Sequence, residues 1–478
     1  MTVLGIVFVV AYVGALFGGR RWVLGVLACS MPFNDSIVVS VGQATLTPFY
    51  LGLILYTVLA YTAWNSKAAS LDRERGGWLL RGLFAYALVV TLIAPALFAG
   101  MGVVAASIGL DQQASSLTPL GYTSSNVAQM VYLFLNVVFV LRNQRDDAFN
   151  SKYVTLGLAV GILVAFSSFT GGSWLHTLFD NSPRNFYMTD AVRLRGQFSE
   201  PSHLGVFALV ATVYFSAMVS RSRSVRSFVG YLVLTGMGVA LLVASASGTA
   251  VVGLLVALVT IVLIAIARVG LRRPDRSLRF RIPVPIFLGM VAGFVGLCLA
   301  LPGIVTSVAQ IIAGKAGTLS LSTRTIVDQH SLDILVHTDL MGAGNGSNRS
   351  SSLLVMLLSQ IGLVGTLLFI AVIVVAVIAG LSVASRVPVA LALVAFVSAA
   401  FVSFADFASP ILWTLLACAL AARPNLLGAR PNLLGGLSGS LRSPRPPLSP
   451  IGPASSRSPQ KRGSVEKRNR EPFDESGS

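Results

Sequence analysis

Two stretches of the sequence bring arginine together with acidic residues and histidine. The first runs Arg193-Leu-Arg195-Gly-Gln-Phe-Ser-Glu200-Pro-Ser-His203, and the second extends from Arg324 to Arg349. A guanidinium grips a phosphate with two hydrogen bonds and keeps its proton. If Arg193, Arg195, Arg324 and Arg349 converge, they form a site for an anionic group such as a phosphate. The alternative is that they form ion pairs with nearby carboxylates, which contribute about 0–1 kcal/mol each when exposed.

The second stretch ends in a glycine-rich run, Gly342-Ala-Gly344-Asn-Gly346. Backbone N–H groups in such a run can approach the same anion. A flexible turn is the other interpretation, and glycine content alone does not separate the two.

Glu200 and His203 are competing candidates for a general base, the group that accepts a proton during a reaction. Glu200 precedes Pro201, which keeps the Glu200 backbone extended, so we expect a helix to begin near Ser202. His203 then lies in the first turn, where the positive end of the helix dipole favours a neutral imidazole. The alternative is that Glu200 pairs with Arg195 and that His203 anchors the helix end.

The residues predict no metal ion. His330 and His337 are seven residues apart and would share one face of a helix, but no third ligand follows at a supporting spacing. Cys29, Cys298 and Cys418 lie in apolar stretches, where cysteine acts as a small core residue.

The composition indicates what kind of protein carries these stretches. Apolar residues make up 54% of the 478 residues and charged residues 11%, whereas a soluble domain carries about 25% charged residues. These values exclude an ordinary soluble enzyme, a disulfide-rich secreted domain and a disordered chain. The sequence predicts an all-α bundle of transmembrane helices, because backbone in lipid must form its hydrogen bonds within the protein.

A membrane-spanning helix needs about 20 apolar residues, and the sequence predicts 12 or 13 such spans. The expected spans are 2–18, 22–40, 46–64, 79–100, 126–141, 152–169, 203–219, 227–245, 248–267, 284–301, 353–381, 387–404 and 408–422. The last two come from one long apolar stretch, which we divide because Asp406 and Pro410 lie near its middle.

The formal charge of +17 is explained by basic residues in the cytoplasmic loops of a membrane protein, and it does not indicate nucleic-acid binding. Most Lys and Arg residues lie in short turns that alternate along the chain, as cytoplasmic loops do. Two long loops, 170–202 and 302–352, are then on the outer side, and they contain both arginine-bearing stretches. We expect a membrane domain over residues 1–422 and a disordered basic cytoplasmic tail over 423–478, which is rich in Pro, Ser, Gly and Arg.

This order of features resembles the O-antigen polymerase and ligase superfamily of bacterial envelope polysaccharide synthesis. The resemblance rests on the many spans, the Arg193–His203 stretch that leads into a helix, the Ser245-Ala-Ser-Gly-Thr turn, and a large outer loop with Gly342–Gly346 before Gly362-Leu-Val-Gly365. It extends over about residues 1–422 in architecture.

The resemblance implies a reaction at the outer face of the bacterial inner membrane. Members of the superfamily transfer a glycan from a polyprenyl diphosphate to an acceptor sugar, without a cofactor or a metal. The implied partners are a polyprenyl-diphosphate-linked glycan, membrane lipids, and flippase, chain-length or export proteins. The arginines would hold the diphosphate leaving group, and Glu200 or His203 would accept the proton of the attacking hydroxyl.

The motifs favour a polymerase over a ligase. Family ligases carry a histidine, then Asn, Ser or Gln, nine residues and Gly-x-x-Gly, and Ser351 stands at the histidine position here. Family polymerases often show Arg, ten residues and Gly, a spacing that neither Arg195 nor Arg324 meets. We predict a polymerase of an envelope polysaccharide or exopolysaccharide. The alternatives are ligase-type transfer of a finished glycan, a transporter or flippase, and a scaffold of an export complex.

Overall fold

The computed structural model describes residues 1–41, 44–62, 76–104, 117–170, 177–182, 193–270 and 319–421. Its helices are α1 (Val3–Gly18), α2 (Arg20–Ser30), α3 (Pro48–Thr62), α4 (Gly77–Leu97), α5 (Ser124–Asp146), α6 (Ser151–Ser167), α8 (Pro201–Val219), α9 (Val225–Ala244), α10 (Gly248–Gly270), α13 (Leu319–His337), α14 (Leu353–Leu381), α15 (Val387–Ser403) and α16 (Pro410–Leu420), with 3-10 turns at Ser168–Thr170 and Ala384–Arg386. The predicted span 284–301 and the predicted tail 423–478 lie outside the described residues.

Helices of membrane-spanning length confirm the predicted helical membrane bundle. Six are long and apolar enough to cross a membrane: Gly77–Leu97, Ser124–Asp146, Pro201–Val219, Val225–Ala244, Leu353–Leu381 and Ala384–Ser403. Five further apolar helices are shorter, namely Val3–Gly18, Pro48–Thr62, Ser151–Ser167, Gly248–Leu263 and Pro410–Leu420. The chain is therefore a multi-pass membrane protein, with fewer full-length spans in its described part than the 12 or 13 predicted.

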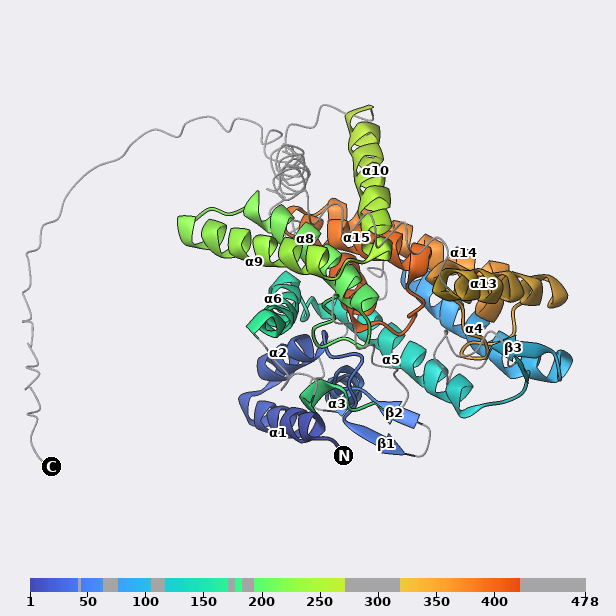
Figure 1. Cartoon of the computed structure of the whole chain (residues 1–478). Coiled ribbons are helices and arrows are strands. Elements are labelled where there is room, and N and C mark those ends of the chain that lie inside the picture. The colour runs from blue at the N-terminus through green and yellow to red at the C-terminus, as the bar shows by residue number, and fades with distance from the viewer. Residues whose placement is uncertain are drawn as a thin grey trace, which may run out of the picture. The chain divides into compact units, whose positions relative to one another are not determined.

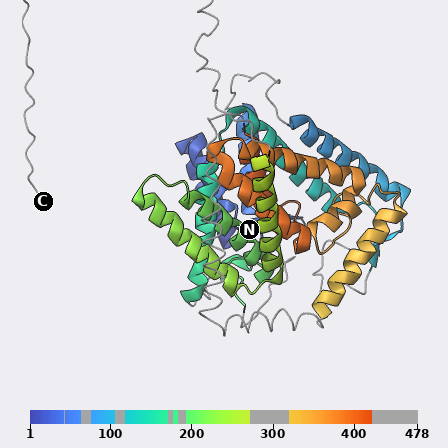
Figure 2. The same ribbon diagram turned by 90° about the horizontal axis from the view of Figure 1, so that it is seen from above.

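Helices α8 and α15 form the centre of the bundle (Figures 1 and 2). They are the most deeply buried of the six long helices and pack against each other, with α9 beside α8 and α10 beside α15. Small residues allow these close approaches. A Cβ added to Gly253 in α10 would lie 2.7 Å from the Cβ of Ala399 in α15.

Two predicted elements differ from the observed ones. The predicted span 22–40 ends at Ser30, because Pro32, Asn34 and Asp35 favour a turn. The chain then forms the antiparallel pair β1 (Val39–Val41) and β2 (Ala44–Leu46). The predicted outer loop 302–352 contains helix α13, which is too polar for a search of apolar runs to detect.

The predicted division of residues 387–422 is confirmed. Helix α15 ends at Ser403 and α16 begins at Pro410, so that Asp406 lies in the connection between them. A second short antiparallel pair, β3 (Gly102–Val104) and β4 (Leu117–Pro119), follows α4.

Helix α14 is interrupted at Gly362, which has a φ of 66° that side-chain-bearing residues rarely adopt. The loop after α13 runs along this interruption. Leu363 donates its backbone N–H to the Leu340 carbonyl at 2.9 Å, and Gly344 donates to the Gln360 carbonyl at 2.8 Å. The interruption thus holds the loop that leads to Arg349.

Candidate active site

A cavity of about 280 Å³ lies where several connections between helices meet. Its wall includes the turn after α2, the start of α8, the loop between α13 and α14, and the α15–α16 connection. The ionisable residues that line it are Asp35, Glu200, His203, Arg324, Arg349 and Asp406. Four of the ionisable residues predicted from sequence, Glu200, His203, Arg324 and Arg349, therefore share one cavity, which Gly346 also lines.

The start of α8 places Glu200 and His203 on the cavity wall. As predicted, Glu200 has an extended backbone and the helix begins at the next residue, Pro201. The hydroxyl of Ser202 donates to Oε2 of Glu200 at 2.8 Å. Burial raises the pKa of the Glu200 carboxyl, but His203, the Ser202 hydroxyl, Arg324 and Arg349 outweigh it and hold this pKa below its ordinary value. Glu200 is therefore an ionised group that faces the two arginines.

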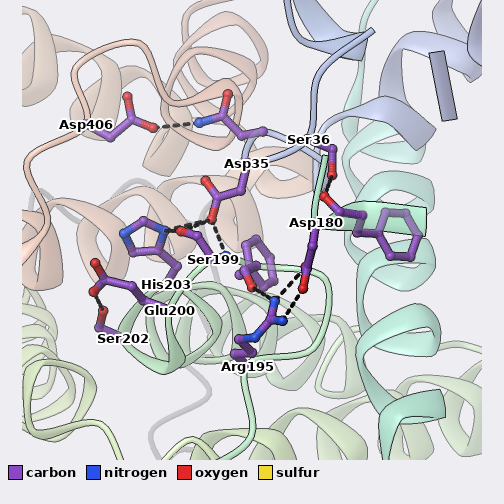
Figure 3. A network of polar contacts seen from close by, with 12 residues as sticks. Asp35, Ser36, Asp180, Arg195, Ser199, Glu200, Ser202, His203 and Asp406 are labelled. Carbon is purple, nitrogen blue, oxygen red and sulfur yellow. Dashed lines mark hydrogen bonds and ion pairs between the residues drawn. The ribbon is translucent and has the colours of Figure 1, made fainter. Parts of the chain in front are cut away.

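His203 is bound to Asp35, a residue 168 positions earlier in the chain. Its Nδ1 lies 2.9 Å from Oδ2 of Asp35, and the backbone N–H and hydroxyl of Ser199 each donate to the same oxygen at 2.7 Å (Figure 3). Burial raises the pKa of the Asp35 carboxyl. The contacts with His203 and Ser199 outweigh burial and lower this pKa to about 2.

This pair has two consequences for the imidazole. Because Asp35 engages Nδ1, Nε2 is the nitrogen that can meet a substrate. The expectation that the helix dipole sets the charge of His203 needs correction, since a carboxylate at 2.9 Å acts more strongly than the partial charge of a helix end. The ring of Phe404 packs edge-on against the imidazole, with the centroids 4.9 Å apart.

Asp406 lines the same cavity from the α15–α16 connection. Its Oδ2 accepts a hydrogen bond from Nδ2 of Asn34 at 2.8 Å (Figure 3). Burial and the charge of Asp35 raise the pKa of Asp406 to about 6, against the opposing influence of His203, the Ala408 backbone and Asn34. This carboxyl therefore exchanges its proton near neutral pH.

Arg324 and Arg349 approach the cavity from different segments. The Nη1 of Arg324, in α13, donates to the hydroxyl of Ser403 at 2.6 Å. Arg349 is placed by its backbone N–H, which donates to the Val104 carbonyl of β3 at 3.0 Å. Both arginines line the same cavity as Glu200, and their charges lower the pKa of its carboxyl.

Arg193 and Arg195 are not among the residues that line the cavity. Arg195 is buried and forms an ion pair with Asp180, with Nη1 2.8 Å from Oδ1 and 2.9 Å from the Phe198 carbonyl. Its guanidinium points toward Asp180 rather than His203 (Figure 3). The Nε of Arg193 donates to the Ser245 carbonyl at 3.3 Å. The expected convergence of four arginines is thus corrected to two, and the Arg195–Glu200 pair that was the alternative interpretation is replaced by Arg195–Asp180.

The glycine-rich run supports the loop and does not present its N–H groups to the cavity, contrary to our expectation. The N–H groups of Gly342, Gly344 and Gly346 donate to the Thr338 hydroxyl at 3.0 Å, the Gln360 carbonyl at 2.8 Å and the Gln360 side chain at 3.1 Å. All three glycines have φ between 82° and 103°, a backbone that other residues rarely adopt. Their role is to let the loop pass close to α14 and to place Arg349.

The histidines of the second stretch and Asp328 are not among the residues that line the cavity. His330 contacts the Gly102 carbonyl through Nε2 at 3.0 Å, and exposed His337 contacts the Asp333 carbonyl at 2.7 Å. Asp328 accepts a hydrogen bond from the backbone N–H of Ser351 at 2.8 Å. Within the described ranges, no three His, Cys, Asp or Glu side chains are grouped to hold a metal ion.

Sequence reasoning missed the parts of the site that short turns contribute. Asn34 and Asp35 fell inside a predicted span, although the Pro-Phe-Asn-Asp-Ser composition of residues 32–36 is a turn signal. Asp406 was noted as an ionisable group in a membrane stretch, but its contact with Asn34 joins residues 372 positions apart.

No known family model matches the sequence, and a search of curated proteins finds no match.

Proposed function

We propose that this protein is an integral membrane glycosyltransferase that polymerises polyprenyl-diphosphate-linked oligosaccharide units of an envelope polysaccharide or exopolysaccharide. Its place would be the bacterial inner membrane, where flippase, chain-length or export proteins would be its partners. The observation that carries the proposal is the convergence of Arg324 and Arg349 with Glu200, His203 and Asp406 on one cavity.

The two arginines suit the donor substrate. A diphosphate carries several negative charges and planar sets of oxygen atoms, which guanidinium groups bind through paired hydrogen bonds. Glu200, which lines the cavity with both arginines, would help to orient the guanidinium groups for the donor. The membrane-spanning helices around the cavity would allow the polyprenyl chain to stay in lipid while its head group enters.

The arginines also suit the reaction. As the acceptor hydroxyl oxygen bonds to the anomeric carbon, the bond from that carbon to the phosphate oxygen breaks, and the electron pair leaves with the diphosphate. Arg324 and Arg349 would stabilise this developing charge. The hydroxyl proton must pass to a base on the cavity wall, for which Glu200 and His203 are the candidates predicted from sequence.

A deletion strain tests the polymerase activity. We expect its lipid-linked and surface glycans to contain single repeat units, and plasmid-borne wild-type protein to restore long chains. Full-length polymer that accumulates on the lipid carrier would instead indicate a ligase. Unchanged surface polysaccharide would contradict both.

The proposed reaction also requires the cavity to face the outer side of the membrane. Single cysteines at exposed His337 and at exposed Lys152, in the first turn of α6, provide the two reporters. A membrane-impermeant thiol reagent applied to intact cells should label position 337 and not position 152. The opposite pattern would reverse the orientation and contradict the proposal.

A further inference from the structure

The α15–α16 connection contributes a carboxylate that the proposed function has not yet used. We propose that Asp406, oriented by Asn34, is the catalytic base that accepts the proton of the acceptor sugar hydroxyl. This inference rests on the proposed glycosyl transfer and goes beyond it by assigning the acceptor side of the cavity to Asn34 and Asp406.

The Asp406 carboxylate is oriented and still has room for a substrate hydroxyl. Asn34 donates to Oδ2 at 2.8 Å, and the backbone N–H of Ala408 also donates to the carboxylate. An ionised carboxylate has about four acceptor positions, so a hydroxyl in the cavity can bind as well. The second hydrogen and the oxygen of the Asn34 amide offer further contacts to neighbouring hydroxyl groups of a sugar.

The connection that carries Asp406 is fixed on several sides. The Ala408 carbonyl accepts a hydrogen bond from the Tyr50 hydroxyl at 2.6 Å, and the Phe407 carbonyl accepts one from Nε1 of Trp413 at 2.7 Å. Ser403, just before the connection, is bound to Arg324. One short segment therefore holds both the proposed base, Asp406, and one proposed diphosphate-binding group, Arg324. This segment fixes the distance between the acceptor side and the diphosphate side of the cavity.

The other acidic groups of the cavity are less suited to take a proton. The pKa of Asp35 is about 2 in its contact with His203, and that of Glu200 is held below its ordinary value. Burial and the neighbouring Asp35 bring the pKa of Asp406 to about 6. A base is most effective when its pKa lies near the working pH, and Asp406 alone among these three carboxyls meets that condition.

The groups around Asp406 come from every element packed near it. Asp35 contributes from the turn after α2 and raises the pKa of Asp406, whereas His203 contributes from α8 and lowers it. Tyr50 of α3 interacts electrostatically with Asp406, and Glu200, Arg324 and Arg349 line the same cavity.

In the proposed step, the proton leaves the acceptor oxygen as that oxygen bonds to the anomeric carbon. Asp406 becomes a neutral acid and then releases the proton to water.

The test compares Asp406→Asn with wild type in membrane vesicles from the deletion strain, supplied with its accumulated lipid-linked units. Asp406→Asn keeps the shape and removes the basic oxygen, so at pH values well above 6, where Asp406 is ionised in wild type, we expect turnover to fall about 10²-fold or more. Binding of radiolabelled farnesyl diphosphate, the probe for the arginine side, should be unchanged. Wild-type turnover should fall as the pH drops through about 6, because the base works only when ionised. Near-normal turnover by Asp406→Asn would overturn the assignment.

A second variant and a control keep the result interpretable. Asn34→Ala removes a hydrogen-bond donor that favours the ionised carboxylate, so the acidic limb of the wild-type profile should move to higher pH. An unmoved limb would also overturn the assignment. Asp333→Asn changes an exposed aspartate of α13 outside the cavity and should leave the profile unchanged. Failure of wild-type protein to bind farnesyl diphosphate or to extend glycans would refute the proposed function itself, which is distinguishable from a failure of Asp406 alone.

Discussion

Two polar regions of the bundle use the same residue types in different ways. One region joins the connections next to α2, α5 and α15: Arg20 and Arg142 pair with Asp146, and Arg386 pairs with Asp147 at 3.1 Å. In the other region, two arginines, three carboxylates and a histidine surround a cavity of about 280 Å³. The pairs of the first region join helix ends, whereas the second region, which includes the Asp35–His203 pair, surrounds a space that can admit a substrate. Position around a cavity, rather than residue type, separates the two roles.

The largest difference between the regions should appear when the cavity arginines are removed. Each charge-assisted contact to a diphosphate contributes about 1.5–3 kcal/mol, so Arg324→Gln with Arg349→Gln should weaken farnesyl diphosphate binding by ~10²- to 10⁴-fold. Replacement by lysine should restore binding only in part, because lysine lacks the two-point grip. Binding can be measured on protein in nanodiscs.

The matched control is Arg193→Gln, which changes an arginine of the first stretch that does not line the cavity. It should bind the probe as wild type does. Equal loss in this control and in the double variant would remove the distinction between the two kinds of arginine.

A large effect of a different kind is expected at Arg195. Its buried guanidinium is paired with Asp180, and breaking a buried pair costs about 3–5 kcal/mol because one charge is left behind. Arg195→Gln should therefore lower the thermal stability and the amount of protein. Probe binding per folded molecule should stay near the wild-type value, as measured by active-site titration. Selective loss of binding at full stability would place Arg195 in the binding site after all.

At the paired region, Arg386→Gln should give a smaller change. Arg386 is buried, but the side chain of its partner Asp147 is 36% exposed, so solvent reduces the penalty for leaving the carboxylate alone. We expect a loss of about 1–2 kcal/mol in unfolding free energy and unchanged turnover per molecule. A marked loss of turnover at normal stability would show that this region also takes part in the reaction.

Among the cavity residues, the smallest expected effect on turnover concerns Glu200. With Asp406 as the base, Glu200→Gln removes only a carboxylate that lies near the two arginines. Probe affinity should change, while turnover at saturating substrate stays within about tenfold of wild type, less than the loss of a general base. Complete loss of turnover with intact probe binding would instead identify Glu200 as the base. Near-normal turnover in His203→Ala would likewise exclude His203.

The helical membrane fold could be predicted from the sequence because apolar runs report burial in lipid directly. The start of α8 at Pro201 and the break near Asp406 also followed from local signals, namely proline geometry and an ionisable group in an apolar stretch. Helix α13 was missed because its polar sequence carries no such signal.

The candidate site could be predicted in part. Arg324 and Arg349 were found because their stretch brings arginine together with acidic residues and histidine, but that argument applied equally to Arg193 and Arg195. The difference lies in Asp180 and in the Ser245 carbonyl, whose contacts are set by tertiary packing. For the same reason the Asp35–His203 and Asn34–Asp406 contacts were invisible, since each joins distant turns.

The sequence separations of these contacts determine when the site can assemble during synthesis. The loop beside α14 is held by a contact between Leu340 and Leu363, which are about twenty positions apart in the sequence. This contact can form as soon as that segment is made. Asn34 and Asp406 lie 372 residues apart, so their contact must wait until α15 and the start of α16 have been inserted. A domain made from its N-terminus thus completes its acceptor side last. A ribosome-bound chain that ends before residue 406 would carry both arginines but lack the proposed base and part of the cavity wall.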